Sequence, residues 1–213
     1  MSLFWNTVTD EMRTVLSGFA RSEMGDRFYL AGGTALSLQI GHRLSVDLDF
    51  FSPTEDIPSI RAELEHALTP LQAIYASSAW GNLIYLAHGV RMGFYGYGFP
   101  LVAPLVKTDG MRLASVEDIA LMKLDTLLSR ASRKDFYDLY FICQTISLTN
   151  IFKKANLKFP SVRDFEVQAT KRLVFFENAE QESDPVLLHE ANWGAVKKYF
   201  TTLAKSIEQG WLK

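Results

Sequence analysis

Residues 31–51 of the chain read AGGTALSLQIGHRLSVDLDFF, and their pattern predicts the core of the fold. An apolar run ends at two glycines, a helix-forming run follows up to Gly41, and a second apolar run carries two aspartates. Short apolar runs bounded by turn residues are typical of buried strands. The stretch and the residues just before it therefore predict, in order, a strand at 28–31, a helix at 34–40 and a strand at 46–51.

The two aspartates of the second strand, Asp47 and Asp49, are spaced to share one face. Side chains at i and i+2 of a strand point the same way. The apolar neighbours Val46, Leu48 and Phe50 predict that the opposite face is buried. Two unpaired carboxylates so close together would be costly without a cation. Hard carboxylate oxygens suit Mg²⁺ or Mn²⁺ bound jointly with phosphates. The structural alternative is that His42 and Arg43 neutralise the pair.

The turn Gly32-Gly33-Thr34 lies between the first strand and the helix. Glycines let a ligand approach the backbone closely, and the start of a helix offers unpaired N–H groups to an anion. Thr34 could cap the helix or donate its hydroxyl to a phosphate. A plain helix start is the alternative for the turn alone. The order of this turn, one helix and then the strand that carries the two aspartates favours a site for a nucleoside triphosphate and Mg²⁺.

The rest of the chain predicts an α/β first half and a helical second half. Apolar periodicity divides the chain into an α/β core at 1–110 and a helical region at 111–213. In the core we expect helices at 4–20 and 56–68 and strands at 71–77, 82–87 and 90–95. In the helical region we expect helices that begin near 115 and 134, and others at 148–156, 162–176 and 192–208.

Composition excludes several classes of protein. The 213 residues are 48% hydrophobic and carry a formal net charge of −2, which excludes a mainly disordered chain. The single cysteine, Cys143, excludes a disulfide within the chain, and its apolar neighbours predict a buried residue rather than a nucleophile. No His or Cys spacing suits zinc. Without a signal peptide or a long apolar run, we expect a cytoplasmic protein with no membrane partner.

Charge is uneven in the second half. Residues 150–173 carry a net charge of +4 and residues 177–190 a net charge of −5. Solvated faces are one interpretation. The other is a basic surface that helps to hold RNA.

Two motifs carry a resemblance to a known family. The run AGGTALSLQIGHRLSVDLDFF resembles the core of the nucleotidyltransferase superfamily, and GGTAL…HR.S.DLDFF resembles the AbiEii/AbiGii toxins of type IV toxin–antitoxin systems. Residues 115–142, SVEDIALMKLDTLLSRASRKDFYDLYFI, resemble the helical K…R…KD..DLY motif of that family. The resemblance covers about residues 27–142 and implies a polymerase-beta-like core with a small mixed sheet. It also implies a helical C-terminal region that completes the active site.

The resemblance implies a role for each residue that matches a motif. Asp47 and Asp49 are expected to bind the metal and to be catalytic. Lys123 is expected to neutralise a phosphate oxygen, and Asp135 to orient or deprotonate the acceptor hydroxyl or to complete the metal shell. The residues expected around the nucleotide are Gly32, Gly33, Thr34, Arg43 and Ser45.

The implied activity is transfer of a nucleoside monophosphate from an NTP to a hydroxyl group, with Mg²⁺ or Mn²⁺ as cofactor. Expected partners are the NTP, RNA such as tRNA, and a cognate AbiEi-like antitoxin. One departure is that the strand at 90–95 lacks the third carboxylate found in many nucleotidyltransferases. Either Asp135 supplies that function, or no conventional base is used, or the enzyme is weak. The alternatives are a non-catalytic module that binds a nucleotide or a partner, and a kinase-like phosphotransferase.

Overall fold

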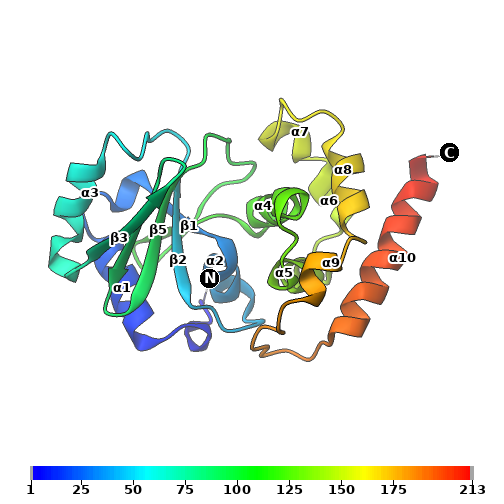
Figure 1. The fold of residues 1–213 in the computed structure, drawn as a ribbon, viewed down its shortest axis with the longest axis horizontal. Coiled ribbons are helices and arrows are strands. Elements are labelled where there is room, and N and C mark those ends of the chain that lie inside the picture. The colour runs from blue at the N-terminus through cyan, green and yellow to red at the C-terminus, as the bar shows by residue number, and fades with distance from the viewer. Residues whose placement is uncertain (1, 212–213) are drawn as a thin grey trace. The chain divides into compact units, whose positions relative to one another are not determined.

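The computed structural model describes residues 2–211, which form two compact units (Figure 1). The first unit ends at Ser115 and the second begins at Val116. The boundary expected at residue 110 falls in the tight turn Asp109-Gly110, where both residues have positive φ.

Within the described residues, the first unit contains one mixed sheet of seven strands in the order β3-β4-β5-β2-β1-β7-β6. β2 runs parallel to β5 and β1 parallel to β7, and the other neighbours are antiparallel. The mixed sheet that the family resemblance implied is therefore confirmed. The strands are β1 (Tyr29–Ala31), β2 (Asp47–Ser52), β3 (Ile74–Ala79), β4 (Asn82–Ala87), β5 (Val90–Gly96), β6 (Val106–Thr108) and β7 (Met111–Leu113).

The helices of the first unit are α1 (Asp10–Ala20), α2 (Gly32–Ile40) and α3 (Arg61–Leu68), with 3₁₀ turns η1 (Trp5–Thr7), η2 (Gly25–Arg27) and η3 (Thr69–Leu71). The helix expected at 4–20 starts at Asp10 because Thr9 caps it, accepting a hydrogen bond from the Met12 N–H at 3.2 Å. β6 and β7 were not predicted. Three residues each are too few for an apolar periodicity to identify.

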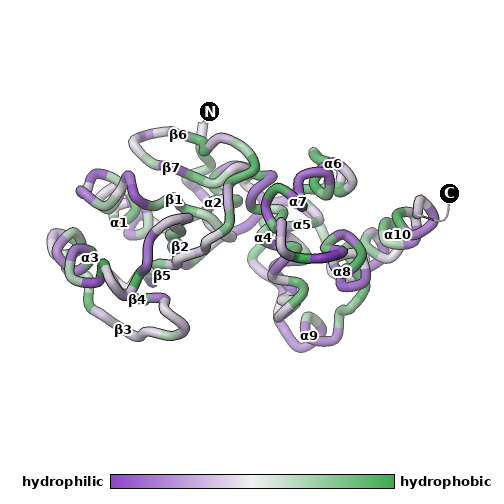
Figure 2. The backbone as a smooth tube through the Cα atoms, turned by 90° about the horizontal axis from the view of Figure 1, so that it is seen from above, coloured by the Kyte–Doolittle hydropathy of each residue, from purple (hydrophilic) through white to green (hydrophobic). Residues whose placement is uncertain are grey.

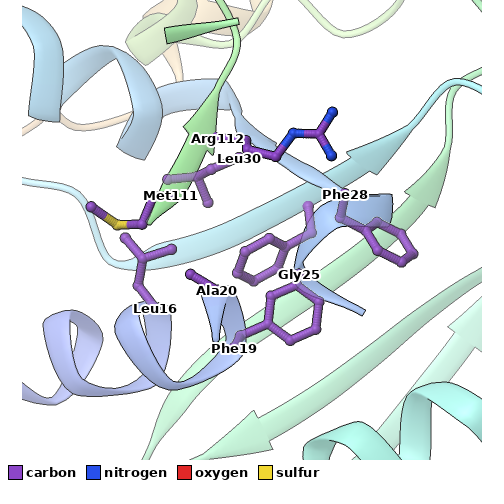
Figure 3. Close-up of a pocket in the computed structure, with 9 residues that line it drawn as sticks. Leu16, Phe19, Ala20, Gly25, Phe28, Leu30, Met111 and Arg112 are labelled. Carbon is purple, nitrogen blue, oxygen red and sulfur yellow. The ribbon is translucent and has the colours of Figure 1, made fainter. Parts of the chain in front are cut away.

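Aromatic side chains fill the core of the first unit. Phe19 of α1 packs on Phe50 of β2, with ring centroids 4.5 Å apart, and on Phe94 of β5, at 5.2 Å. Phe28 closes the cluster at 6.1 Å from Phe19. The cavity in Figure 3, which Phe19 and Phe28 help to line, has a volume of only about 10 Å³, room for about one water molecule. It is a packing gap and not a ligand site.

The second unit contains only helices among its described residues. They are α4 (Val116–Ser129), α5 (Arg133–Cys143), α6 (Leu148–Phe152), α7 (Ala155–Lys158), α8 (Phe165–Arg172), α9 (Glu177–Glu180) and α10 (Trp193–Trp211). Phe136 of α5 contacts the rings of Phe176, Trp193 and Phe200 at 5.2–5.9 Å, which fixes α5 against α10. The four-residue α9 was not predicted.

Ion pairs within the second unit use part of its uneven charge. In the basic segment, Lys154 pairs with Glu117 at 2.7 Å and Lys158 pairs with the fully buried Asp118 at 2.9 Å. The acidic segment includes α9, around which Figure 2 shows the purple of hydrophilic residues. In this segment, Glu182 accepts a hydrogen bond from the Ser132 hydroxyl at 2.7 Å. Part of the charge of both segments is therefore used within the unit, which weakens the case for a basic RNA surface.

Across residues 2–211, no helix combines the length and the apolar character needed to cross a bilayer.

We predict that Phe19→Ala lowers the free energy of unfolding by about 3–5 kcal/mol, because it removes a buried ring that contacts three others. Urea denaturation would measure this. Trp80→Ala is the control, since Trp80 is 99% exposed, and it should change stability little. Equal effects of the two substitutions would contradict this description of the core.

Candidate functional site

The predicted acid pair lies on one face of β2, as the spacing indicated. Asp47 and Asp49 are partly exposed. Leu48, which lies between them, and Phe50, which follows, are buried on the other face. Val46, expected to be buried with them, is 71% exposed because it precedes the first residue of the strand. The carboxylates therefore stand on the accessible face of a sheet with an apolar core behind it.

The neighbouring strand β5 adds a second row of side chains to this face. Its parallel register places Arg91 beside Asp47, Gly93 beside Asp49 and Tyr95 beside Phe51. Arg91 forms an ion pair with Asp49, with Nη1 at 3.2 Å from Oδ1. The Tyr95 hydroxyl donates to the same oxygen at 3.2 Å and accepts from Arg91 Nη2 at 3.0 Å. Asp49, Arg91 and Tyr95 thus form a closed triangle.

Gly93 makes this triangle possible. A Cβ atom on Gly93 would lie 2.4 Å from the Tyr95 hydroxyl and 2.6–2.7 Å from its ring carbons. The ring also stacks on Phe51, with centroids 4.9 Å apart. Burial and the negative charge of Asp49 raise the pKa of Tyr95 above its ordinary value, which keeps the phenol protonated as a donor.

The glycine–threonine turn is packed against β2. Gly32 has φ of +67°, a conformation that favours glycine, and a Cβ atom there would lie 3.2 Å from Asp49 Oδ2. Thr34 does not cap the helix, because α2 already begins at Gly32. Its buried hydroxyl instead bonds to the Ser45 hydroxyl at 2.7 Å and donates to the Asp47 carbonyl. Thr34 and Ser45 thereby fix the position of Asp47.

The N-terminus of α2 keeps features that suit an anion. Ala31 stands at its N-cap and contributes no side-chain hydrogen bond. The first N–H groups of the helix therefore lack the side-chain acceptor that a Ser, Thr, Asp or Asn would supply, and they carry the positive end of the helix dipole. Gly33 in this turn also makes room for Arg43, whose Nη2 lies 2.1 Å from where a Cβ atom would stand.

In the second unit, Lys123 of α4 lies between two aspartates of α5. Its Nζ is 2.7 Å from Asp135 Oδ1 and 2.6 Å from Asp138 Oδ2, and both carboxylates are fully buried. Arg130, largely exposed, approaches the other oxygen of Asp135 at 3.5 Å. That oxygen, Oδ2, has no hydrogen-bond partner. The three buried charges tie the two helices together, and the second oxygen of Asp135 has only the longer ion pair with Arg130.

The donor set of the first unit fits a divalent cation that a substrate also binds. No group of three or more His, Cys, Asp or Glu residues with metal-binding geometry occurs in residues 2–211. Asp47 and Asp49 offer two hard carboxylates on an accessible face. Mg²⁺ commonly uses one or two carboxylates together with substrate phosphates. The two carboxylates would supply only part of the coordination shell of a cation, and the phosphates of a nucleotide would supply further oxygen ligands.

The structure also places the other residues considered from the sequence. The seven expected in the first unit, Gly32, Gly33, Thr34, Arg43, Ser45, Asp47 and Asp49, lie around β2 and the start of α2. Lys123 and Asp135 contact each other in the second. Sequence reasoning missed Arg91, Tyr95 and the pairing of Asp138.

Burial raises the pKa of Cys143 to about 11, which disfavours the thiolate a nucleophile needs.

Known proteins share this fold. The structure of JHP933 from Helicobacter pylori is similar with a TM-score of 0.56 at 17% identity, covering 94% of this chain and 90% of that one. MenT4, a nucleotidyltransferase toxin of Mycobacterium tuberculosis H37Rv, is similar with a TM-score of 0.55 at 17% identity, covering 95% and 89%. The fold is therefore that of nucleotidyltransferases.

The family follows from sequence comparison. The protein aq_aa25 of Aquifex aeolicus (strain VF5) is 34% identical over 202 residues, covering 92% of this chain and 95% of that protein. The family model described as "Nucleotidyl transferase AbiEii toxin, Type IV TA system" matches residues 14–78 and 89–211. The chain belongs to this family, as its two motifs implied.

We predict that Gly33→Ala destabilises the first unit, because the new methyl group would displace the Arg43 guanidinium, which is buried and donates to the Leu44 carbonyl at 2.9 Å. Overpacking costs about 1–3 kcal/mol, more than the ~1 kcal/mol that alanine gains in a helix. Gly210→Ala in α10, with open space around it, is the matched control. Urea unfolding in which both variants match the wild type would refute the close approach.

Lys123→Met should destabilise the protein by about 3–5 kcal/mol, because it leaves Asp135 and Asp138 buried without their cation. Lys154→Met removes a partly exposed pair and should cost about 0–1 kcal/mol. Thermal unfolding of both variants would measure the difference. If Lys123→Met unfolds at the wild-type temperature, Lys123 does not hold α4 to α5.

Proposed function

We propose that this protein is a metal-dependent nucleotidyltransferase that transfers a nucleoside monophosphate from an NTP to a hydroxyl group of RNA, with tRNA as the expected acceptor. The observation that carries the proposal is the pair Asp47 and Asp49, held on the accessible face of β2 beside the uncapped start of α2. Membership of the AbiEii family supports the reaction class.

In the proposed reaction, the acceptor hydroxyl oxygen attacks the α-phosphorus of the NTP. A new P–O bond forms, the bond from the α-phosphorus to the bridging oxygen breaks, and pyrophosphate leaves. The hydroxyl proton passes to a base or to water. Mg²⁺ or Mn²⁺ held by Asp47 and Asp49 would neutralise charge on the phosphates. The N–H groups at the start of α2 would bind a phosphate oxygen, and Thr34 and Ser45 keep Asp47 in place.

The third carboxylate of many nucleotidyltransferases has no counterpart on β5, where Arg91, Gly93 and Tyr95 face the acid pair. We propose Asp135 as the group that orients the acceptor hydroxyl or takes its proton. Its Oδ2 supports this role, because that oxygen makes no hydrogen bond and has only the 3.5 Å ion pair with the exposed Arg130, so it would accept a hydroxyl proton once Arg130 moved aside. Lys123 holds Asp135 in place through its 2.7 Å ion pair, and the contact of Lys123 with a phosphate stays a prediction.

We further propose that the protein acts as a toxin and that a cognate AbiEi-like antitoxin is its partner. The family description supports this assignment. A non-catalytic nucleotide-binding module is the second candidate, favoured by one observation: Asp49 is already neutralised by Arg91, and β5 contributes no third acid.

The experiment incubates the protein with Mg²⁺, total RNA and each α-³²P-labelled NTP in turn. Asp47→Asn/Asp49→Asn should lower transfer by at least about 10²–10³-fold, because it removes the charge that holds the metal. Asp26→Asn/Asp109→Asn is the matched control, since it removes the same charge from exposed positions of the first unit. It should retain wild-type transfer.

Label in a tRNA-sized band with the wild type and the control, and none with the Asp47/Asp49 variant, would support the proposal. Full activity of the Asp47/Asp49 variant would contradict the mechanism. Label in protein would identify a protein-modifying enzyme instead. Nucleotide binding without transfer would favour the non-catalytic module.

A further inference from the structure

The triangle formed by Asp49, Arg91 and Tyr95 has a consequence for the order in which ligands bind. Asp49 Oδ1 accepts from both the guanidinium and the phenol, at 3.2 Å in each case. A divalent cation that uses this oxygen must compete with a positive charge already in contact with it. The row of Asp47, Asp49 and Arg91 carries a net charge of −1, and a third carboxylate in place of Arg91 would make it −3. The attraction for a free cation is correspondingly weaker.

We propose that Arg91 and Tyr95 are positioning residues that hold Asp49 before the metal arrives and make metal binding depend on the triphosphate. This inference rests on the proposed metal role of Asp47 and Asp49. A triphosphate offers Arg91 another anionic partner, and a guanidinium binds phosphate oxygens with two parallel hydrogen bonds. Moving Arg91 from Asp49 to a phosphate frees one lone pair of Oδ1 for the metal, while the other still accepts from the Tyr95 hydroxyl. Phosphate and metal then favour each other's binding.

The surroundings of Arg91 allow this exchange. Its side chain is 38% exposed, so that the guanidinium can turn towards solvent without being pulled from the core. Tyr95 is held more firmly, because its ring lies over Gly93 and stacks on Phe51 at 4.9 Å. When Arg91 leaves, the phenol can still donate to Asp49 and keep the carboxylate in its rotamer. Arg91 is therefore the mobile member of the triangle and Tyr95 the fixed one.

The coupling is reciprocal and makes two predictions of opposite sign. Without phosphate, Arg91→Gln should bind Mn²⁺ about five- to tenfold more tightly than the wild type, because the competing charge is gone. Without metal, the same variant should bind inorganic tripolyphosphate about five- to tenfold more weakly, because a phosphate ligand is lost. A merely structural role of Arg91 would weaken both affinities or neither.

Isothermal titration of the full chain with Mn²⁺ alone and with tripolyphosphate alone measures both affinities. Arg91→Lys keeps the charge and should retain Mn²⁺ affinity close to the wild-type value. Tyr95→Phe removes one donor to Asp49 but leaves the charge of Arg91 in place, and should change Mn²⁺ affinity less than Arg91→Gln does. Arg61→Gln is the matched control: it removes one positive charge from α3, where Arg61 pairs with Glu65, and should change neither affinity. Circular dichroism checks that each variant folds.

The proposal is overturned if Arg91→Gln binds Mn²⁺ no more tightly than the wild type, or binds tripolyphosphate equally well. Asp49→Asn separates this failure from failure of the proposed function. If Asp49→Asn loses Mn²⁺ binding while Arg91→Gln changes nothing, only the triangle is wrong. If Asp49→Asn binds Mn²⁺ like the wild type, the metal role of the acid pair is wrong, and the dependence on Arg91 falls with it.

Discussion

The parallel pairing of β2 with β5 is the constraint on which the rest of the first unit depends. It aligns Asp47 with Arg91, Asp49 with Gly93 and Phe51 with Tyr95. A slip of one residue would turn Leu48 and Phe50 to the accessible face and place the carboxylates against the aromatic core. Burial of Phe50 among Phe19 and Phe94 therefore fixes the register, and the register brings the acids beside Arg91.

Three consecutive residues at the start of α2 depend on the same strand. The positive φ of Gly32 brings backbone close to Asp49, Gly33 leaves room for Arg43, and Thr34 is bonded to the Asp47 carbonyl. The turn therefore has a structural explanation independent of any ligand. It also leaves the start of α2 without a side-chain cap. The helix can therefore pack against β2 and still offer its first N–H groups to an anion.

The sequence predicted the parts of this site that are local. The i, i+2 spacing placed Asp47 and Asp49 on one face, and apolar runs located β2, β4 and β5 to within a residue at either end. Arg91 and Tyr95 were missed because the partner of a strand depends on tertiary packing and leaves no mark on its own periodicity. The capping role considered for Thr34 was wrong because α2 starts two residues earlier, where glycine permits φ of +67°. The ion pair of Asp138 with Lys123 was missed because it also depends on tertiary packing, since it joins two helices.

Asp47 and Asp49 are together proposed to hold a metal that arrives with a triphosphate. The most direct measurement is a crystal structure of the protein soaked with Mn²⁺ and tripolyphosphate, with the metal located by its anomalous scattering. We expect an anomalous peak bound by both carboxylates and by phosphate oxygens, with Arg91 moved from Asp49 onto the phosphate. A peak away from these two aspartates, or tripolyphosphate bound elsewhere with the triangle intact, would contradict this proposal.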